Sequence, residues 1–134
     1  MNIDKLTELY KKYNLTKEDV FKHQHYVIIT RTGIEKIEAQ ENIKINYQAI
    51  KCEPNFAVIK AVGELNDRKM ETYGSALKGG NYKDGNTNTW YVAEMAEKRA
   101  FSRIVLKLTG FYALGVFGED ESEDFKKKIN IYKQ

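Results

Sequence analysis

The sequence predicts an α+β fold, in which an antiparallel β-meander of three to four strands packs against one long C-terminal helix and short helices precede the sheet. Two observations lead to this class. Segments rich in β-branched and aromatic residues are grouped in the middle of the chain and do not alternate with helical segments, which favours an antiparallel sheet. A single long apolar stripe with helical spacing follows them, and it can cover one face of that sheet.

Four short elements are expected before the meander. In chain order they are a helix over 2–13, a short helical turn over 16–22, a strand over 26–30 and a short helix over Ile34–Gln40. The first helix follows from apolar residues at helical spacing. Thr16 and Asp19 resemble a capping box, with Asp in place of the usual Glu, and therefore indicate a helix start. Thr32-Gly33 stops the strand.

The meander is expected over residues 43–77. Its members are a half-buried strand from Ile43 to Ala49, a strand over Phe56–Leu65 and its partner over Lys69–Leu77. The first strand is predicted from the alternation of apolar with polar residues. Asn66-Asp67 provides the tight turn between the other two. Residues 78–89 hold three glycines, three asparagines and one aspartate, and are expected to form a flexible loop.

The clearest element is a helix over Trp90–Leu108, whose small and branched apolar side chains lie on one broad stripe. Gly110 stands where the C-cap of this helix is expected. The acidic cluster Glu119–Asp124 and the lysines that follow it predict a mobile charged tail. The chain is therefore expected to form a single domain over 1–118, followed by a tail over 119–134.

The composition is typical of a globular chain from a reducing compartment. The apolar share is 42% and the charged share 31%, which is ordinary for a folded domain. Cys52 is the only cysteine, so it cannot form an internal disulfide, and with two histidines it cannot complete a standard Cys/His zinc site. No apolar run approaches about 18 residues, and no signal peptide is recognisable. We therefore expect a soluble, cytoplasmic protein that does not span a membrane.

The candidate binding residues are cations of the long helix, namely Lys98, Arg99, Arg103 and Lys107. The last three are four residues apart, so they are expected to line one ridge opposite the apolar stripe. Aligned cations on a rigid helix suit the regularly spaced charges of a phosphate backbone. Exposed aromatic side chains could stack unpaired bases, and the candidates are Tyr26, Tyr47, Tyr73, Tyr82, Trp90 and Tyr91. The alternatives are a merely solvated helix face, with Glu94 paired to Lys98, and aromatics that belong to the core or to an oligomer interface.

No arrangement of residues demands catalysis. His23 and His25 lack a third metal ligand at a recognisable spacing. Gly79-Gly80 lacks the Lys-Thr/Ser pair of a phosphate-binding loop. A nuclease-type magnesium site would need carboxylates to converge, and the candidates are Asp67, Glu71, Glu94 and Glu97. We therefore predict no catalytic residue, no metal and no cofactor, with a metal-dependent nuclease as the less favoured alternative.

The segment A-E-M-A-E-K-R-A-F-S-R-I-V-L-K-L-T-G over 93–110 resembles the final core helix of the single-strand annealing proteins. This superfamily includes eukaryotic annealing recombinases, phage Sak proteins and bacterial DdrA. Tyr26–Gly33, with Arg31 just before a glycine turn, resembles the first strand of the same core. Tyr73–Ala76, before a loop and the long helix, fits the family order, and Gly115–Glu121 resembles a segment that follows this helix in many phage proteins. The resemblance covers residues 20–118.

The resemblance implies ATP-independent binding of single-stranded DNA in the groove of a ring-shaped or filamentous homo-oligomer, with pairing of complementary strands in phage-type recombination or replication. It places Arg31, Arg103 and Lys107 at phosphate-contacting positions, whereas Lys98 and Arg99 match the charge pattern alone. A phage-encoded member would act in the host cytoplasm, on single strands of DNA or RNA.

Two departures from the family pattern leave single-strand binding without annealing as an alternative. The chain lacks the basic C-terminal extension of the family, and its tail begins acidic. A non-catalytic structural or protein-interaction domain of a mobile element is the other main alternative.

Overall fold

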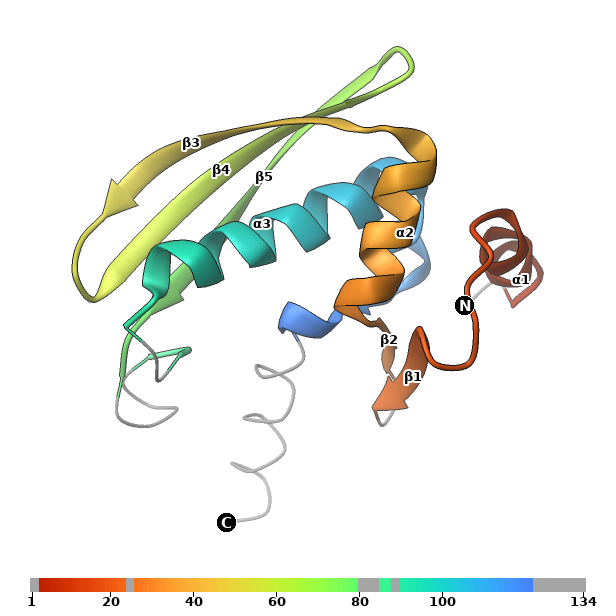
Figure 1. The fold of residues 1–134 in the computed structure, drawn as a ribbon, viewed down its shortest axis with the longest axis horizontal. Helices are drawn as coiled ribbons and strands as arrows, with labels where there is room; N and C mark the ends of the chain where they lie inside the picture. The colour runs from red at the N-terminus through yellow and green to blue at the C-terminus, as the bar shows by residue number, and fades with distance from the viewer. Residues whose placement is uncertain (1–2, 24–25, 80–84, 88–89, 122–134) are drawn as a thin grey trace.

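A computed structural model describes residues 3–23, 26–79, 85–87 and 90–121, and it confirms the α+β class (Figure 1). The helices are α1 (Ile3–Lys12), α2 (Arg31–Glu41) and α3 (Val92–Thr109), with short 3₁₀ turns η1 (Tyr112–Leu114) and η2 (Glu119–Glu121). The strands are β1 (Val20–His23), β2 (Tyr26–Ile29), β3 (Lys44–Cys52), β4 (Phe56–Leu65), β5 (Arg68–Leu77) and β6 (Val116–Gly118). None of the described helices is both long and apolar enough to cross a bilayer.

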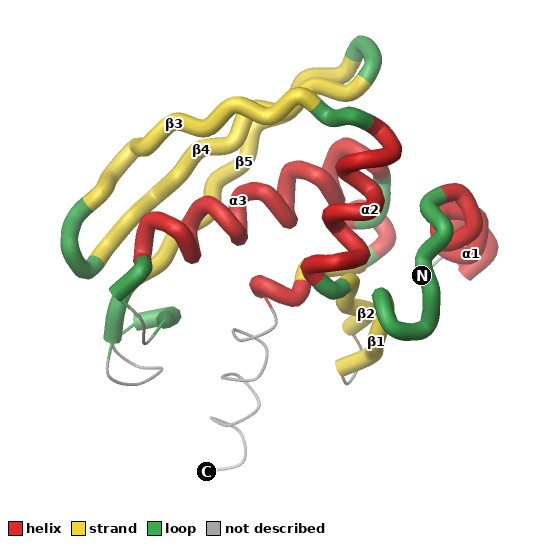
Figure 2. The backbone as a smooth tube through the Cα atoms, in the orientation of Figure 1, coloured by secondary structure: helices red, strands yellow, loops and turns green. Residues whose placement is uncertain are grey.

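The main layer is the antiparallel meander β3-β4-β5, which arches over α3 (Figures 1 and 2). α3 packs chiefly against β4 and β5. The two layers approach closely because small side chains face each other, with Ala57, Ala61 and Ala76 of the sheet and Ala96 and Ala100 of the helix fully buried. This arrangement agrees with the predicted meander and covering helix.

A second, smaller sheet also packs on α3, through its strand β6. In it β1 pairs with β2 in antiparallel fashion, and β2 pairs with β6 in parallel. Val27, Ile28 and Ile29 of β2 are buried, which makes this short strand part of the core. Thr30 then caps α2, because its hydroxyl accepts a hydrogen bond from the Gly33 amide at 3.1 Å.

The ends of several elements follow the predicted signals. β4 spans the predicted Phe56–Leu65, and β5 begins one residue earlier than expected. Asn66 in the turn between them has a φ of 57°, which is the left-handed conformation that such a turn requires. Gly110 has a φ of 91° and is the C-cap of α3.

The helical turn predicted over 16–22 is wrong, because residues 20–23 form strand β1. The Asp19 carboxylate accepts hydrogen bonds from the Thr16 amide at 2.9 Å and from its hydroxyl at 3.1 Å. This contact closes a turn, as the capping-box pattern indicates, but no helix continues from it. Val20 instead pairs with Ile29 across the sheet, so long-range pairing overrides the local signal.

Two further expectations differ from the structure. The first meander strand is not half-buried. Among the residues of β3 only Ile45 falls below the exposed class, because α3 packs chiefly on β4 and β5. The acidic start of the predicted tail, Glu119–Glu121, forms η2 and packs on α3, so the domain extends beyond residue 118. The rest of that tail, and residues 80–84 and 88–89 of the predicted loop, lie outside the described residues.

Asp19 provides a test of the turn before β1. Burial alone would raise the pKa of its carboxyl, but hydrogen bonds from Lys36, at 2.7 Å, and from Thr16 outweigh that effect and lower the pKa below the usual range. Asp19→Asn is therefore expected to lower the free energy of unfolding at pH 7 by about 1–3 kcal/mol.

The stabilisation is present above the unfolded-state pKa of about 4 and is lost as the pH falls through the lower folded-state pKa. Urea denaturation should show a smaller difference between wild type and Asp19→Asn near pH 3, measured with the exposed neighbour variant Glu18→Gln as the control. A difference that does not change with pH would contradict the ionic role of Asp19.

Candidate nucleic-acid interface

Arg99 does not lie on an exposed ridge, and this part of the sequence prediction is wrong. Its exposed fraction is 3%, although it is charged. The guanidinium donates to three backbone carbonyls, those of Ser75 at 2.7 Å, Asn86 at 2.9 Å and Asp120 at 3.3 Å. Arg99 thereby joins α3 to the edge of β5 and to η2, and its observed contacts are structural.

Arg31 and Arg103 converge, as a binding groove would require, but they converge on the protein's own acidic segment η2. Arg103 Nε lies 2.7 Å from Glu121 Oε1, and its Nη1 donates to the Tyr73 carbonyl at 2.7 Å. Arg31 Nη1 lies 3.4 Å from Asp120 Oδ2. We name Arg31, Arg99 and Arg103, together with η2, the arginine clamp.

Two of the three carboxylates of the clamp, those of Asp120 and Glu121, are well shielded. Asp120 also accepts a hydrogen bond from the Ser102 hydroxyl at 2.7 Å, and Glu119 accepts one from the Arg31 amide at 3.0 Å. The side chain of Glu121 is 7% exposed. Because these carboxylates already neutralise Arg31 and Arg103, the clamp offers little free charge to a phosphate.

The two remaining predicted cations do not restore the ridge. Lys98 is exposed on α3, as expected. Lys107 places its ammonium 5.4 Å from the centroid of the Tyr112 ring, where a cation–π contact holds it. The predicted cations of α3 therefore do not form one row. Arg99 is buried, Arg103 is paired with Glu121, and Lys98 and Lys107 stand apart from them.

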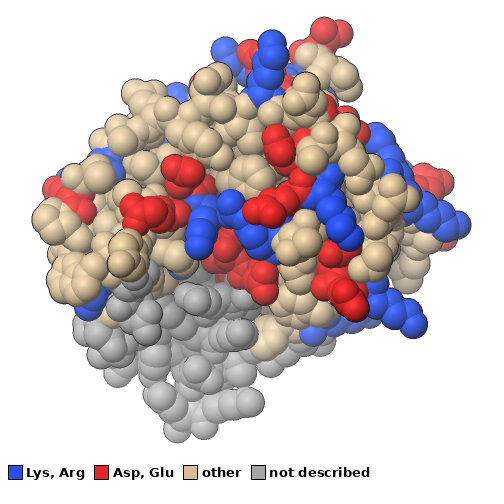
Figure 3. Space-filling model, in the orientation of Figure 1, with Lys and Arg blue, Asp and Glu red and all other residues tan. Residues whose placement is uncertain are grey.

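The face between β3 and the two helices α2 and α3 carries both acidic and basic side chains. Partial burial raises the pKa of Tyr47, on β3, to about 12, with further upward effects from Glu97 and Glu38 and an opposing effect from Arg31. These influences show that carboxylates of both helices face the Tyr47 hydroxyl. Figure 3 shows acidic and basic side chains interspersed over the face that carries α2 and α3. This face suits a phosphate backbone poorly.

The opposite face of the β3-β4-β5 sheet is open. Residues of β4 and β5 alternate between buried positions under α3 and more exposed positions on the other side. Among the described residues, no helix or second sheet packs on that other side (Figure 1). We name it the open face, and the strand registers assign to it Lys44, Asn46, Gln48, Lys51, Phe56, Val58, Lys60, Val62, Glu64, Lys69, Glu71, Tyr73, Ser75 and Leu77.

The open face combines positive charge with an aromatic side chain. Its charged members are four lysines and two glutamates, and only one pair between them, Lys60 with Glu71 at 3.2 Å, forms a contact among the described residues. Tyr73 is 48% exposed and lies directly across the ladder from Lys60. The backbone of Tyr73 is anchored by Arg103 of the clamp, so the ring is presented from a fixed position.

A second aromatic surface lies at the end of the sheet where β5 stops. Lys78 follows β5 and holds its ammonium 4.5 Å from the centroid of the Trp90 ring. Trp90 and Tyr91 are 67% and 71% exposed, respectively, just before α3 begins. Proteins that bind single-stranded nucleic acid combine exposed aromatic rings, on which bases stack, with cations that contact phosphates.

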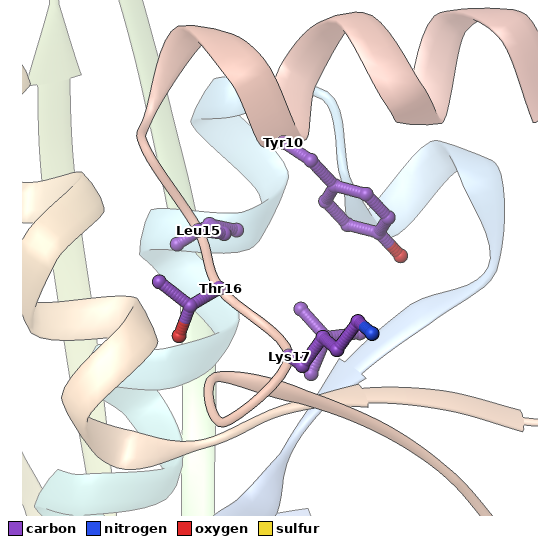
Figure 4. A pocket seen from close by; sticks show the side chains of 5 residues that line it. Tyr10, Leu15, Thr16 and Lys17 are labelled. Atoms are coloured by element: carbon purple, nitrogen blue, oxygen red, sulfur yellow. The ribbon is translucent and has the colours of Figure 1, made fainter.

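None of the catalytic arrangements considered from the sequence is assembled among the described residues. The pocket in Figure 4, of about 320 Å³, lies beside α1 and is lined by Tyr10, Leu15, Thr16, Lys17 and Val20, without a carboxylate, imidazole or thiol. No three His, Cys, Asp or Glu side chains in this part of the chain are placed to hold a metal ion. Glu71 lies on the open face, and Glu94 and Glu97 belong to α3 on the opposite side of the sheet, so the carboxylates considered for a nuclease do not converge.

The lysines of the open face were not singled out from the sequence, although one signal was present. Lys44, Lys60 and Lys69 occupy alternating positions of the strands that place them on the face opposite the buried alanines. Periodicity alone could not tell which face of the sheet a helix covers.

Comparisons of the chain with protein-family models, with curated proteins and with solved structures found no match, so the function has to be inferred from the chemistry of these surfaces.

Proposed function

We propose that the protein binds single-stranded nucleic acid on the open face of its β3-β4-β5 sheet, without ATP and without a covalent reaction. The observation that carries the proposal is the exposed ring of Tyr73 beside Lys60, on an uncovered sheet face with three further lysines. A base can stack on an aromatic ring whatever its identity, while lysines release counterions from the phosphates. The resemblance to single-strand annealing proteins leads to the same ligand, with strand pairing as a further step.

The dimensions of the face support a short single strand. A ten-residue strand such as β4 spans about 33 Å, along which the lysines and Tyr73 are distributed. The Lys78–Trp90 pair lies beyond the end of β5 and is a separate place where a longer strand could stack. In this arrangement Arg99 and Arg103 anchor β5 through its carbonyls, Arg31 holds η2, and none of the three touches the ligand.

Fluorescence anisotropy of a labelled single-stranded oligonucleotide, titrated at several salt concentrations, tests the proposal. If four lysines each contact a phosphate, the slope of log K against log salt should be about −3. Lys44→Glu/Lys69→Glu should weaken binding at least about tenfold at low salt and make the slope shallower by about 1.4. The matched control, Lys11→Glu/Lys17→Glu, changes the net charge equally at exposed positions on and just after α1, and should bind almost as wild type does.

Stacking is tested separately from charge. Tyr73→Ala should cost about 1–3 kcal/mol of binding free energy, whereas Tyr73→Phe, which keeps the ring, should bind nearly as wild type does. Because Trp90 is the only tryptophan, its fluorescence reports whether the strand reaches the end of the sheet.

One observation favours a protein-interaction domain as the second candidate function. The open face also carries the apolar side chains Phe56, Val58 and Leu77. If wild type shows no binding to the oligonucleotide even at low salt, the nucleic-acid proposal fails, and this apolar part of the open face becomes the place to look for a protein partner.

A further inference from the structure

The two edges of the β3-β4-β5 sheet differ in how many of their backbone groups are hydrogen-bonded. Along β5, side chains and a neighbouring segment occupy the edge carbonyls and amides. Arg103 bonds the Tyr73 carbonyl, Arg99 bonds the Ser75 carbonyl, and Asn86 bonds Leu77 through both its side chain and its backbone. The β5 edge is therefore closed to another strand from Tyr73 to Leu77.

The β3 edge is open in the part of the chain that the structure describes. β3 pairs with β4 alone, and its other edge presents a row of unpaired backbone groups. Ahead of the irregularity between Ala49 and Lys51 the strand is regular. Exposed apolar side chains accompany this edge, with Tyr47 41% and Ile50 50% exposed. A partly apolar edge without a charged side chain between its flanking lysines is a template for strand addition.

We propose that β3 pairs with β3 of a second copy of this chain, antiparallel and about a two-fold axis at Tyr47. This register places Tyr47 opposite Tyr47 of the second copy, Asn46 opposite its Gln48, and Ile45 opposite its Ala49. Such pairs of aromatic, amide and aliphatic side chains stabilise a sheet. Five residues of each copy, 45–49, are paired before the irregularity interrupts the strand.

The charges of β3 select this register over its neighbour. A shift of one residue in either direction would turn the side chains to the wrong faces, and in one direction it would also place Lys44 opposite Lys51 of the second copy. In the proposed register neither lysine meets a cation across the axis. A β5 edge could not replace β3 as the partner, because its carbonyls are already bound by arginines.

The dimer has a consequence that rests on the proposed function. Edge pairing would join the two meanders into one six-stranded sheet, with both open faces on the same side. The four lysines and Tyr73 of each copy would then form one continuous surface, and the length of oligonucleotide bound per dimer should be about twice that of a monomer.

The mass of the full chain, measured without nucleic acid by analytical ultracentrifugation over a range of concentrations, tests the dimer itself. Wild type should pass from monomer to dimer as its concentration rises. Asn46→Glu/Gln48→Glu opposes carboxylates across the axis and should shift the dissociation constant upward at least about tenfold. Asn46→Lys/Gln48→Glu opposes unlike charges at the same positions and should restore the dimer.

A second measurement locates the axis. In a Cys52→Ser background, Tyr47→Cys should form an intermolecular disulfide on oxidation, because directly opposed residues in an antiparallel pair lie about 4.5–5.5 Å apart. Lys69→Cys, at an exposed position of β5 away from the proposed axis, serves as the control and should not crosslink efficiently.

Three results would overturn the proposal: a monomer at all concentrations, an oligomer unaffected by Asn46→Glu/Gln48→Glu, or a dimer that Asn46→Lys/Gln48→Glu fails to restore. Because no nucleic acid is present, each of these results leaves the proposed function to be judged by its own binding assay.

Discussion

Gly74→Val is expected to leave the protein largely unfolded at room temperature, because β5 and α3 touch at this residue. A Cβ atom built on Gly74 would lie 2.5 Å from the Ala100 amide nitrogen and would also collide with the Ala96 carbonyl oxygen. Both are backbone atoms of α3, so no side-chain rotation can relieve the overlap. Overpacking typically costs about 1–3 kcal/mol, and a clash between two backbones should exceed that range.

Thermal unfolding followed by circular dichroism would test this contact in three variants. Gly74→Ala should lower the melting temperature strongly and Gly74→Val should abolish the cooperative transition. Ser75→Ala, at the next residue but with its side chain on the open face, should stay within about 0.5 kcal/mol of wild type. A Gly74→Ala protein that melts as wild type does would show that α3 lies farther from the sheet than the structure places it.

Gly63 offers an internal comparison for the same helix–sheet contact. A Cβ there would meet Ile104 Cγ1 at 2.7 Å and Leu108 Cδ1 at 2.8 Å. Those atoms belong to flexible side chains that can rotate away. The loss of stability from Gly63→Ala should therefore be smaller than that from Gly74→Ala.

The elements with strong local patterns could be predicted from the sequence. The alanines of α3, its C-cap Gly110 and the Asn66 turn each combine a periodic or conformational requirement with a residue suited to it. β1 and β6 could not be predicted in the same way. They are four and three residues long, and each exists because it pairs with β2, a segment distant from β6 along the chain.

The types of residue in the candidate site could be predicted from the sequence, but the surface on which they lie could not. The sequence indicates cations and aromatics, and Tyr73 and Trp90 are exposed as a stacking role requires. It does not indicate that the acidic segment beginning at Glu119 returns to Arg31 and Arg103. The contact with Arg31 joins residues 88 and 89 positions apart, and the contact with Arg103, 18 positions apart, depends on the path of the chain after α3. Hence the arginines predicted to bind a phosphate backbone instead bind η2 within the arginine clamp, and the open face is the candidate surface.

Arg99→Met should lower the free energy of unfolding by about 3–5 kcal/mol, even though methionine keeps much of the side chain's bulk. The substitution leaves the carbonyls of Ser75, Asn86 and Asp120 without their guanidinium donor. A shielded carbonyl that loses its partner costs about 1–3 kcal/mol, and the arginine that Arg99→Met replaces is itself only 3% exposed.

Lys98→Met is the matched control, since Lys98 precedes Arg99 on the same helix but is exposed. Successive residues of a helix are rotated by about 100°, which turns Lys98 outward while Arg99 reaches the β5 edge. Urea denaturation should therefore separate the two variants, with Lys98→Met within about 0.5 kcal/mol of wild type. Equal, small losses for both would mean that Arg99 is free of its carbonyls in solution and available to a phosphate. A large loss for Arg99→Met alone, with oligonucleotide affinity unchanged below its melting temperature, would assign the arginine to the fold and leave nucleic-acid contact to the lysines.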